Sequence, residues 1–466
     1  MSLKPKDSEK TENLDVITFF DPLVKILRYA GFGPIVWRKD APANLSCSYC
    51  AKTLHIFTRS TYIFLLWIWT FIMSLNIFYK SLSDAETFPG DGRQNMIVKL
   101  LFETPYCFIT VRNATIVSIF LFRNGNILEC ISHAEELRHK LISLGGHVTM
   151  QRFRRRPIIY IATALIIVTL WEIHEWACWF NPDIVGIYSD WPMAPLPVTL
   201  VQYQYAALWW TFSTIPFLLG QLILCFPVLF AYTLRKFVRY INKELISLSR
   251  TNTDSPDARL TGHLGRRITE LREAHFGIAH LLQLVDAAVS DILLVQFLFD
   301  VVVLFGFTGL LVQSRSAEPP ETAMEWTFYA TSAILWFAIF LFHFSFPLIH
   351  MAEEAERTLH LVYTTTLLSP VLFQESYKDI SIFLSEARNN VLAFTGGKFY
   401  YVNRHYIITC LALIFSYIVV LTEMLDRFYG TEEIKRHILQ LSKEVANITR
   451  PGSAQSGVGY HSAPHS

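Results

Sequence analysis

Carboxylates and aromatic rings stand close together at the end of one long apolar segment, LWEIHEWACWF (Leu170 to Phe180). At helical spacing Glu172 and Trp176 share one face, and Trp171 and Glu175 share the neighbouring face. Rings beside carboxylates suit two kinds of ligand: a sugar, which stacks on the rings, or an amine, which makes cation–π contacts. A carboxylate inside an apolar segment is a candidate functional residue, although Trp also gathers at membrane interfaces for structural reasons.

The next apolar segment begins with further polar and aromatic side chains, QYQYAALWWTF. Because successive membrane spans run in opposite directions, this beginning lies at the same level as the end of the segment before it. We therefore expect Gln204 and Trp209 to line a ligand pocket together with Trp171, Glu172 and the residues that follow them.

Arg112 lies near the middle of another apolar segment, where a charged side chain must face protein or water. Glu103 is nine residues away, too far for a pair within one helix. We expect a partner from another segment, with Glu172, Asp291 and Asp300 as the candidates. Arg112 then belongs either to a structural ion pair or to a ligand or gating site.

The last apolar segment ends on a carboxylate, Glu423. If Arg404 marks the inner membrane boundary, Glu423 lies about 28 Å further along a helix, close to the outer boundary. Helical spacing predicts two neighbouring stripes: Ser416, Val420 and Glu423 on one, and Tyr417, Val420 and Met424 on the other.

The composition places these segments in a membrane. Of 466 residues, 52% are hydrophobic and only 17% are charged, whereas soluble proteins carry about 25% charged residues. Because a helix needs about 20 mostly apolar residues to cross a bilayer, we predict an all-α membrane protein with seven transmembrane helices. The spans are Ser60–Tyr79, Leu100–Phe122, Pro157–Phe180, Tyr203–Leu234, Ala288–Gln313, Trp326–Ile349 and His405–Glu423.

Lys and Arg predict the orientation, because they are enriched in cytoplasmic loops. Residues 1–59 hold nine of them, and the connections 123–156, 235–285 and 350–404 hold seven, nine and five. The other three connections hold one, none and one. We therefore expect a cytoplasmic N-terminus and an extracellular C-terminus. Apolar residues at helical spacing in the basic connections predict cytoplasmic helices, which either pack within their own subunit or form an oligomerisation base.

This arrangement predicts three regions. Residues 1–59 form a cytoplasmic N-terminal region, residues 60–425 form the seven-helix region with its cytoplasmic extensions, and residues 426–466 form a partly disordered outer tail. The seven cysteines are scattered, so we expect no disulfide framework. We also expect no cofactor, no metal site and no nucleic-acid partner.

The segment FTGGKFYYVNRHYIITCLALIFSYIVVLTEM resembles the C-terminal motif of the insect gustatory receptor family. That motif has a Gly-Phe-Phe-like stretch, a polar turn and an apolar span, which ends in Thr-Tyr, five apolar residues and Gln-Phe. Ser416-Tyr417 take the Thr-Tyr place, and Glu423-Met424 take the Gln-Phe place. The stretch HMAEEAERT (His350 to Thr358) is similar to an acidic stretch that the family often has after span six. The lead-in positions are Gly397, Phe399, Tyr400 and Arg404.

The resemblance implies a tetrameric, ligand-gated, non-selective cation channel of the plasma membrane that detects a tastant. Four copies of the last span then line one pore, the inner helices form a shared anchor, and a ligand pocket lies in the outer half of each subunit. Glu423 forms a ring of four carboxylates, which selects cations, and Val420 and Met424 form an apolar constriction.

Other classes of function remain to be separated. A G-protein-coupled receptor also has seven spans, but its N-terminus lies outside, and the sequence lacks its Asp-Arg-Tyr and Asn-Pro-x-x-Tyr motifs. A transporter favours inverted repeats, which are not visible. No catalytic triad is legible, so we expect no enzyme. A non-sensory member of the same receptor family is a further alternative.

Overall fold

A computed structural model describes residues 15–30, 57–75, 92–145, 155–180, 210–251, 258–314, 320–368 and 370–423, with Gln440 and Lys443. The chain divides into two compact units, Met1–Ile414 and Phe415–Ser466. The described residues are almost entirely helical, as predicted.

Helix α1 (Val16–Tyr29) lies along the core of the first unit. The side chain of Asp15 caps its start by accepting a 2.8 Å hydrogen bond from the Thr18 amide. The Val16 amide donates to Glu135 at 2.7 Å. Apolar residues at three- and four-residue spacing bury one face, which contacts α3, α4 and α7. The buried residues are Val16, Phe19, Phe20, Leu23, Val24 and Leu27.

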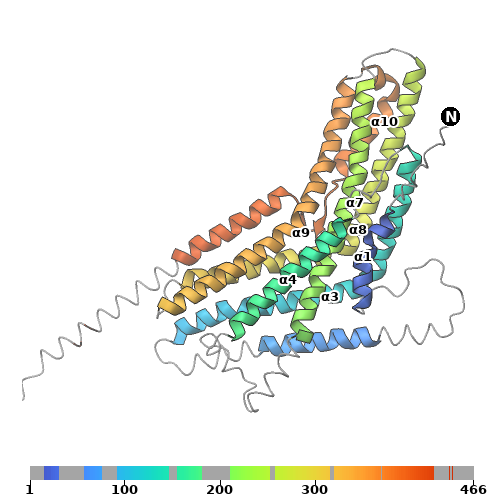
Figure 1. Ribbon diagram of the computed structural model, residues 1–466. Coiled ribbons are helices and arrows are strands. Elements are labelled where there is room, and N and C mark those ends of the chain that lie inside the picture. The colour runs from blue at the N-terminus through green and yellow to red at the C-terminus, as the bar shows by residue number, and fades with distance from the viewer. Residues whose placement is uncertain are drawn as a thin grey trace, which may run out of the picture. The chain divides into compact units, whose positions relative to one another are not determined.

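Long helices make up most of the first unit (Figure 1). The longest have 57 and 52 residues, whereas about 20 residues cross a bilayer, so they extend well beyond a membrane. This agrees with the predicted helical extensions. The elements are α3 (Gly92–Ser143), α4 (Arg156–Phe180), the π-helical turn η2 (Trp210–Thr214), α7 (Ile215–Thr251), α8 (Ala258–Ser314), α9 (Pro320–Leu368) and α10 (Pro370–Asn389). A further helix covers residues 57–75.

Among the described residues, five helices are long and apolar enough to cross a membrane, and the count rises to six if the bent pair in α3 crosses as one span. That pair, Cys107–Arg123 and Gly125–Ser143, bends by 61°. The helix over residues 57–75, where we expect the first span, is not among them. The seven-span count and the orientation therefore stay predictions. The five are Arg156–Ile173, Thr211–Leu248, Gly265–Val312, Thr327–Thr364 and Arg404–Glu423.

The central helix and the last helix differ sharply in burial. In α7, 89% of the most apolar window is buried, and this helix contacts α3, α4, α8 and α9. In the last helix, Arg404–Glu423, the corresponding share is 6%. An apolar helix that its own chain does not cover must face lipid or other copies of the chain.

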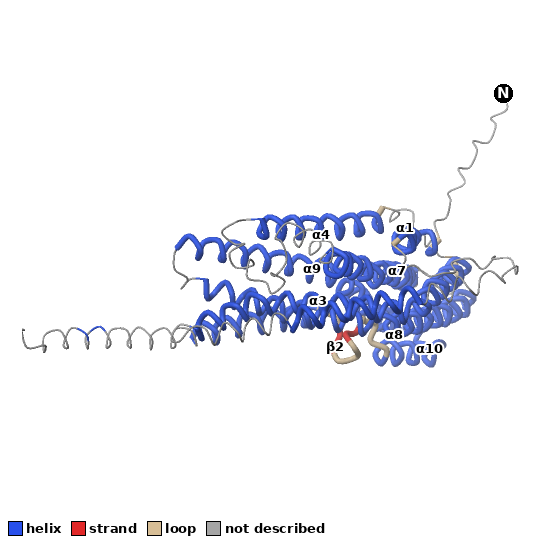
Figure 2. Tube along the Cα trace, turned by 90° about the horizontal axis from the view of Figure 1, so that it is seen from below, coloured by secondary structure: helices blue, strands red, loops and turns tan. Residues whose placement is uncertain are grey.

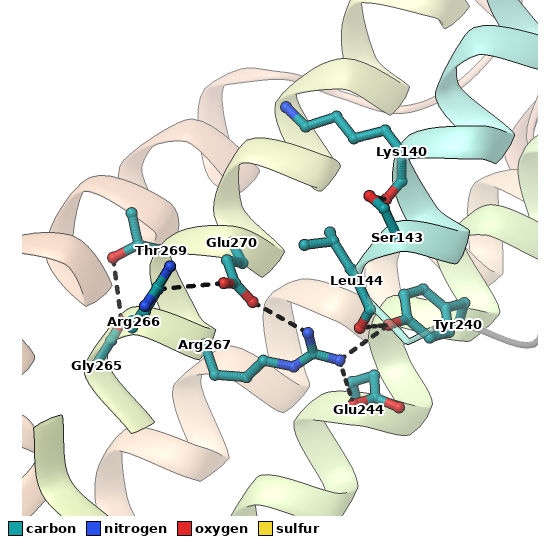
Figure 3. A network of polar contacts seen from close by, with 10 residues as sticks. All are labelled: Lys140, Ser143, Leu144, Tyr240, Glu244, Gly265, Arg266, Arg267, Thr269 and Glu270. Carbon is teal, nitrogen blue, oxygen red and sulfur yellow. Dashed lines mark hydrogen bonds and ion pairs between the residues drawn. The ribbon is translucent and has the colours of Figure 1, made fainter. Parts of the chain in front are cut away.

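Polar contacts join the ends of the long helices next to α10, in the upper part of Figure 1. Arg267 donates to Glu244 at 2.9 Å, to Glu270 at 3.1 Å and to the Tyr240 hydroxyl at 3.0 Å (Figure 3). Tyr240 in turn donates to the Leu144 carbonyl at 3.2 Å. This network ties α7 and α8 to the end of α3.

The acidic stretch after the sixth predicted span forms a second junction. Glu354 of α9 accepts from Arg239 at 2.8 Å and from Asn242 at 3.1 Å, both on α7. Its neighbour Glu353 pairs with Arg404, the first residue of the last helix. The stretch therefore connects three helices, a role that its sequence similarity alone did not reveal.

A short hairpin precedes the last helix and packs against α8 (Figure 2). Strands β1 (Thr395–Gly396) and β2 (Tyr400–Tyr401) pair antiparallel. Both the amide and the hydroxyl of Thr395 donate to the Asp286 carboxylate at 2.7 Å. The Gly397 amide donates to the Ser290 carbonyl at 2.9 Å. Backbone and short side chains thus fix the hairpin to α8.

Candidate functional site

Arg112 of α3 forms a fully buried ion pair with Asp300 of α8, and both side chains have 0% exposure. Gln296, one turn earlier on α8, donates to the other carboxylate oxygen of Asp300. Asn113 accepts from the guanidinium at 3.2 Å. The expected partner from another span is thereby confirmed as Asp300. A buried guanidinium needs such a set of acceptors, because an unpaired charge in the interior is very costly.

Aromatic rings connect this ion pair to helix α4. Phe217 and Phe337 stand over the Arg112 guanidinium, with ring centroids at 5.4 and 5.6 Å. Trp171 of α4 meets Phe337 edge-on at 5.5 Å. Phe337 therefore lies between a cation and an indole, and it brings two of the predicted site residues into one cluster.

Glu172, the next residue on α4, lies beside this cluster. Its carboxylate accepts a 3.0 Å hydrogen bond from the Thr214 hydroxyl. Thr214 is the last residue of the π-helical turn Trp210–Thr214, and such turns often mark functional positions because they change which side chains face inward. Glu172 is partly buried, so it keeps hydrogen-bonding capacity for a further group.

We call the set Arg112, Trp171, Glu172, Thr214, Phe217, Asp300 and Phe337 the polar–aromatic cluster. It contains three of the seven predicted pocket residues. Glu175 and Trp176 lie on α4, but their side chains are not among those described, and Gln204 and Trp209 lie outside the described residues. Phe217, Thr214 and Phe337 were not predicted, because an aromatic or hydroxyl residue inside an apolar run carries no signal of what it faces.

An N-cap residue and a nearby cavity mark the start of the last helix. Asn403 accepts a 3.0 Å hydrogen bond from the Tyr406 amide, as an N-cap residue does. A cavity of about 680 Å³ lies beside this start, between α8, α9, α10 and the loop after α10. Its lining includes Arg388 of α10 and His275 of α8, whose Nδ1 has no partner among the described residues.

The predicted pore residues lie in the C-terminal half of the last helix, within the second unit. Ser416, Val420 and Glu423 are exposed, and Tyr417 is partly buried. Met424 lies outside the described residues. The stripe of Ser416, Val420 and Glu423 is therefore available to lipid, water or another subunit.

The chain belongs to the 7tm chemosensory receptor family, whose sequence profile matches residues 20–423. This is a family of receptors and not of enzymes, as predicted. The chain is therefore a membrane chemosensory receptor, and the sequence-based resemblance is confirmed at this level. No curated protein matches the sequence.

The fold is similar to that of the insect olfactory receptor OR5 from Machilis hrabei. The TM-score is 0.56 at 13% identity, over 87% of this chain and 98% of that one. For the same receptor in complex with eugenol, the TM-score is 0.57 at 12% identity, over 88% of this chain and 98% of that one. At such low identity the likeness concerns the fold alone.

Proposed function

We propose that the chain is one subunit of a gustatory-receptor-like, ligand-gated, non-selective cation channel in the plasma membrane, opened by a small tastant from outside the cell. The observation that carries the proposal is the last helix, which is apolar and ends in a carboxylate, yet has only 6% of its apolar window buried. Membership of a chemosensory receptor family supports the same function.

In this proposal four copies of the last helix surround one pore. The exposed stripe of Ser416, Val420 and Glu423 faces the pore axis, with Tyr417 and Met424 on the neighbouring stripe. A ring of four Glu423 carboxylates concentrates cations at the outer mouth, and an apolar constriction at Val420 and Met424 closes the pore by dewetting.

The polar–aromatic cluster and the sequence-predicted residues Glu175, Trp176, Gln204 and Trp209 form the ligand site in this proposal. Olfactory receptor OR5 has been solved with eugenol, which supports a small-molecule ligand here as well. The rings of Trp171 and Phe337 provide apolar contact, and Glu172 accepts a hydrogen bond from a hydroxyl or an ammonium group of the ligand.

Two carboxylate-to-amide substitutions test the proposal, each as the control for the other. The receptor is expressed in cells without a supplied G protein and screened with sugars, amines, bitter compounds and eugenol for a cation current. We expect Glu423→Gln to change divalent permeability while agonist potency stays the same, because the charge lies at the pore and not at the ligand. We expect Glu172→Gln to shift agonist potency while permeability stays the same.

Three results would contradict parts of this proposal. A response that requires a G protein would favour a G-protein-coupled receptor. Unchanged permeability in Glu423→Gln would remove that residue from the pore, and an unchanged dose–response curve in Glu172→Gln would remove it from the ligand site. A current opened by an internal metabolite rather than an external compound would indicate a non-sensory member of the family.

A further inference from the structure

We propose that Tyr406 is a positioning residue that links the buried Arg112–Asp300 pair to the last helix, so that a change in the polar–aromatic cluster alters the placement of the pore-lining segment. The inference rests on the proposed channel function and adds to it the residues that connect ligand site and gate. All the contacts that carry it lie within the first unit.

The first step leads from the ion pair to the residue one turn earlier on α8. Asp300 and Gln296 are four residues apart on α8 and hydrogen-bond to each other. Phe297, three residues before Asp300, is buried, and its ring centroid lies 5.2 Å from that of Tyr406. One turn of a single rigid helix thus contacts both Arg112 and the start of the last helix.

The second step is a row of three rings. Tyr406 stacks on Tyr400 of the hairpin with ring centroids 4.7 Å apart and an interplanar angle of 5°. A side chain at Gly396 would occupy the space of the Tyr400 ring, since its Cβ would lie 2.2 Å from the Tyr400 Cζ. Tyr406 therefore contacts both Phe297 of α8 and the Tyr400 ring of the hairpin.

The third step concerns where the last helix is anchored. Its buried residues within the first unit are Ile407 and Cys410, both in its first two turns, and Arg404 pairs with Glu353 of α9. These attachments all lie at the beginning of the helix, next to Tyr406. Because closely packed interiors transmit displacement instead of absorbing it, a shift of α8 at Asp300 reaches the last helix through the Phe297–Tyr406 contact.

The first experiment does not require a current. Hydrogen–deuterium exchange is measured on the full-length receptor in lipid nanodiscs for Phe297→Leu and for the control Phe344→Leu. Phe344 is as buried as Phe297, but its ring has no described contact with Tyr406 or Arg112. We expect Phe297→Leu to raise exchange several-fold in the segment 404–414, and Phe344→Leu to leave that segment as in the wild type. Equal exchange in the two variants would overturn the proposal.

The second experiment measures coupling in the current. A double-mutant cycle combines Asp300→Asn with Tyr406→Leu and compares agonist potency and maximal current. We expect the double variant to be no worse than the worse single variant, since both changes interrupt one connection, whereas independent sites give additive effects. Tyr406→Phe keeps the ring and should behave as the wild type.

The two experiments separate the two proposals. If no current is found, the channel function fails, and the exchange data still decide whether Phe297 controls the start of the last helix. Additive effects in the cycle, or a Tyr406→Phe variant as impaired as Tyr406→Leu, would contradict the positioning role while leaving the channel function intact.

Discussion

At the scale of single residues, the Arg112–Asp300 pair combines a high desolvation free energy with a defined geometry. Both side chains are fully buried, and moving two charges out of water costs several kcal/mol for each ion. The cost is offset by the ion pair, by the Gln296 and Asn113 amides and by two aromatic faces. Because of this cost, a buried ion pair is weak evidence of net stabilisation, whereas removal of one partner is strongly destabilising.

This energetic balance gives a prediction for unfolding. Asp300→Asn or Arg112→Met leaves a buried polar group without its partner and should lower the free energy of unfolding by about 3–5 kcal/mol, while Arg112→Met with Asp300→Leu should recover most of the loss. The measurement is thermal unfolding of the detergent-solubilised receptor.

The control is a second Arg–Asp pair, Arg123–Asp291, which links the same two helices but is 34% and 41% exposed. Arg123→Gln should change the free energy of unfolding by about 0–1 kcal/mol, as is usual for surface pairs. Similar losses at the buried and the exposed pair would show that burial does not set the energetics at this site.

The residue scale also shows what sequence can and cannot supply. A charge inside an apolar run must have a partner, and few carboxylates occur in the other spans, so Asp300 could be named as one of three candidates. Phe337 could not, because 36 Phe residues are spread through the chain and apolar runs do not indicate which face meets a cation. The grouping of Trp171 with Arg112 depends on helix packing and not on any local pattern.

At the scale of elements, the hairpin before the last helix depends on glycine. Gly397 has φ +57°, and a Cβ there would lie 2.5 Å from Leu294 Cδ2 and 3.2 Å from its Cβ. Both the left-handed backbone and the close approach to α8 disfavour a side chain at this position.

We therefore expect Gly397→Ala to lower the free energy of unfolding by about 1–3 kcal/mol, as backbone strain and overpacking together do. Gly125→Ala is the control, because a Cβ at Gly125 meets nothing within 4 Å and alanine favours a helix. Thermal unfolding of the two variants and the wild type decides the question. A Gly397→Ala variant as stable as Gly125→Ala would show that the hairpin adapts freely.

Sequence periodicity predicted the long helices well, since each has many turns of apolar spacing. The extensions of α7, α8 and α9 follow from the same pattern. The hairpin could not be predicted in this way, because strands of two residues have no period. Its Gly396-Gly397 pair indicated a turn only in general terms, and its position on α8 depends on hydrogen bonds to Asp286 and Ser290.

At the scale of the whole molecule, the uncovered last helix faces either lipid or other copies of the chain, and the proposed channel uses the second arrangement. Its apolar side chains Leu413, Phe415 and Val419 are exposed, and four chains around a pore cover them in the proposed assembly. Mass photometry of the receptor in detergent should therefore give a particle of four 53.7 kDa chains plus the detergent. A stable, active monomer would contradict the proposed pore.

Orientation belongs to this scale too, and it rests on the distribution of Lys and Arg. Helix packing within one chain does not indicate which end faces the cytoplasm. The orientation therefore stays a prediction from the distribution of Lys and Arg. The fourth predicted span is among the five membrane-capable helices, and the second corresponds to the bent pair in α3.

The exposed tip of the hairpin offers a position for a fluorescent label that follows the receptor during activation. Its turn ends in Phe399, whose side chain is 82% exposed, while the neighbouring Gly397 is tied to α8 through the backbone. The side chain of Phe399 therefore does not hold the hairpin in place. A fluorophore attached at position 399 would sit a few residues from the first turn of the last helix, where its emission reports the local environment of the joint.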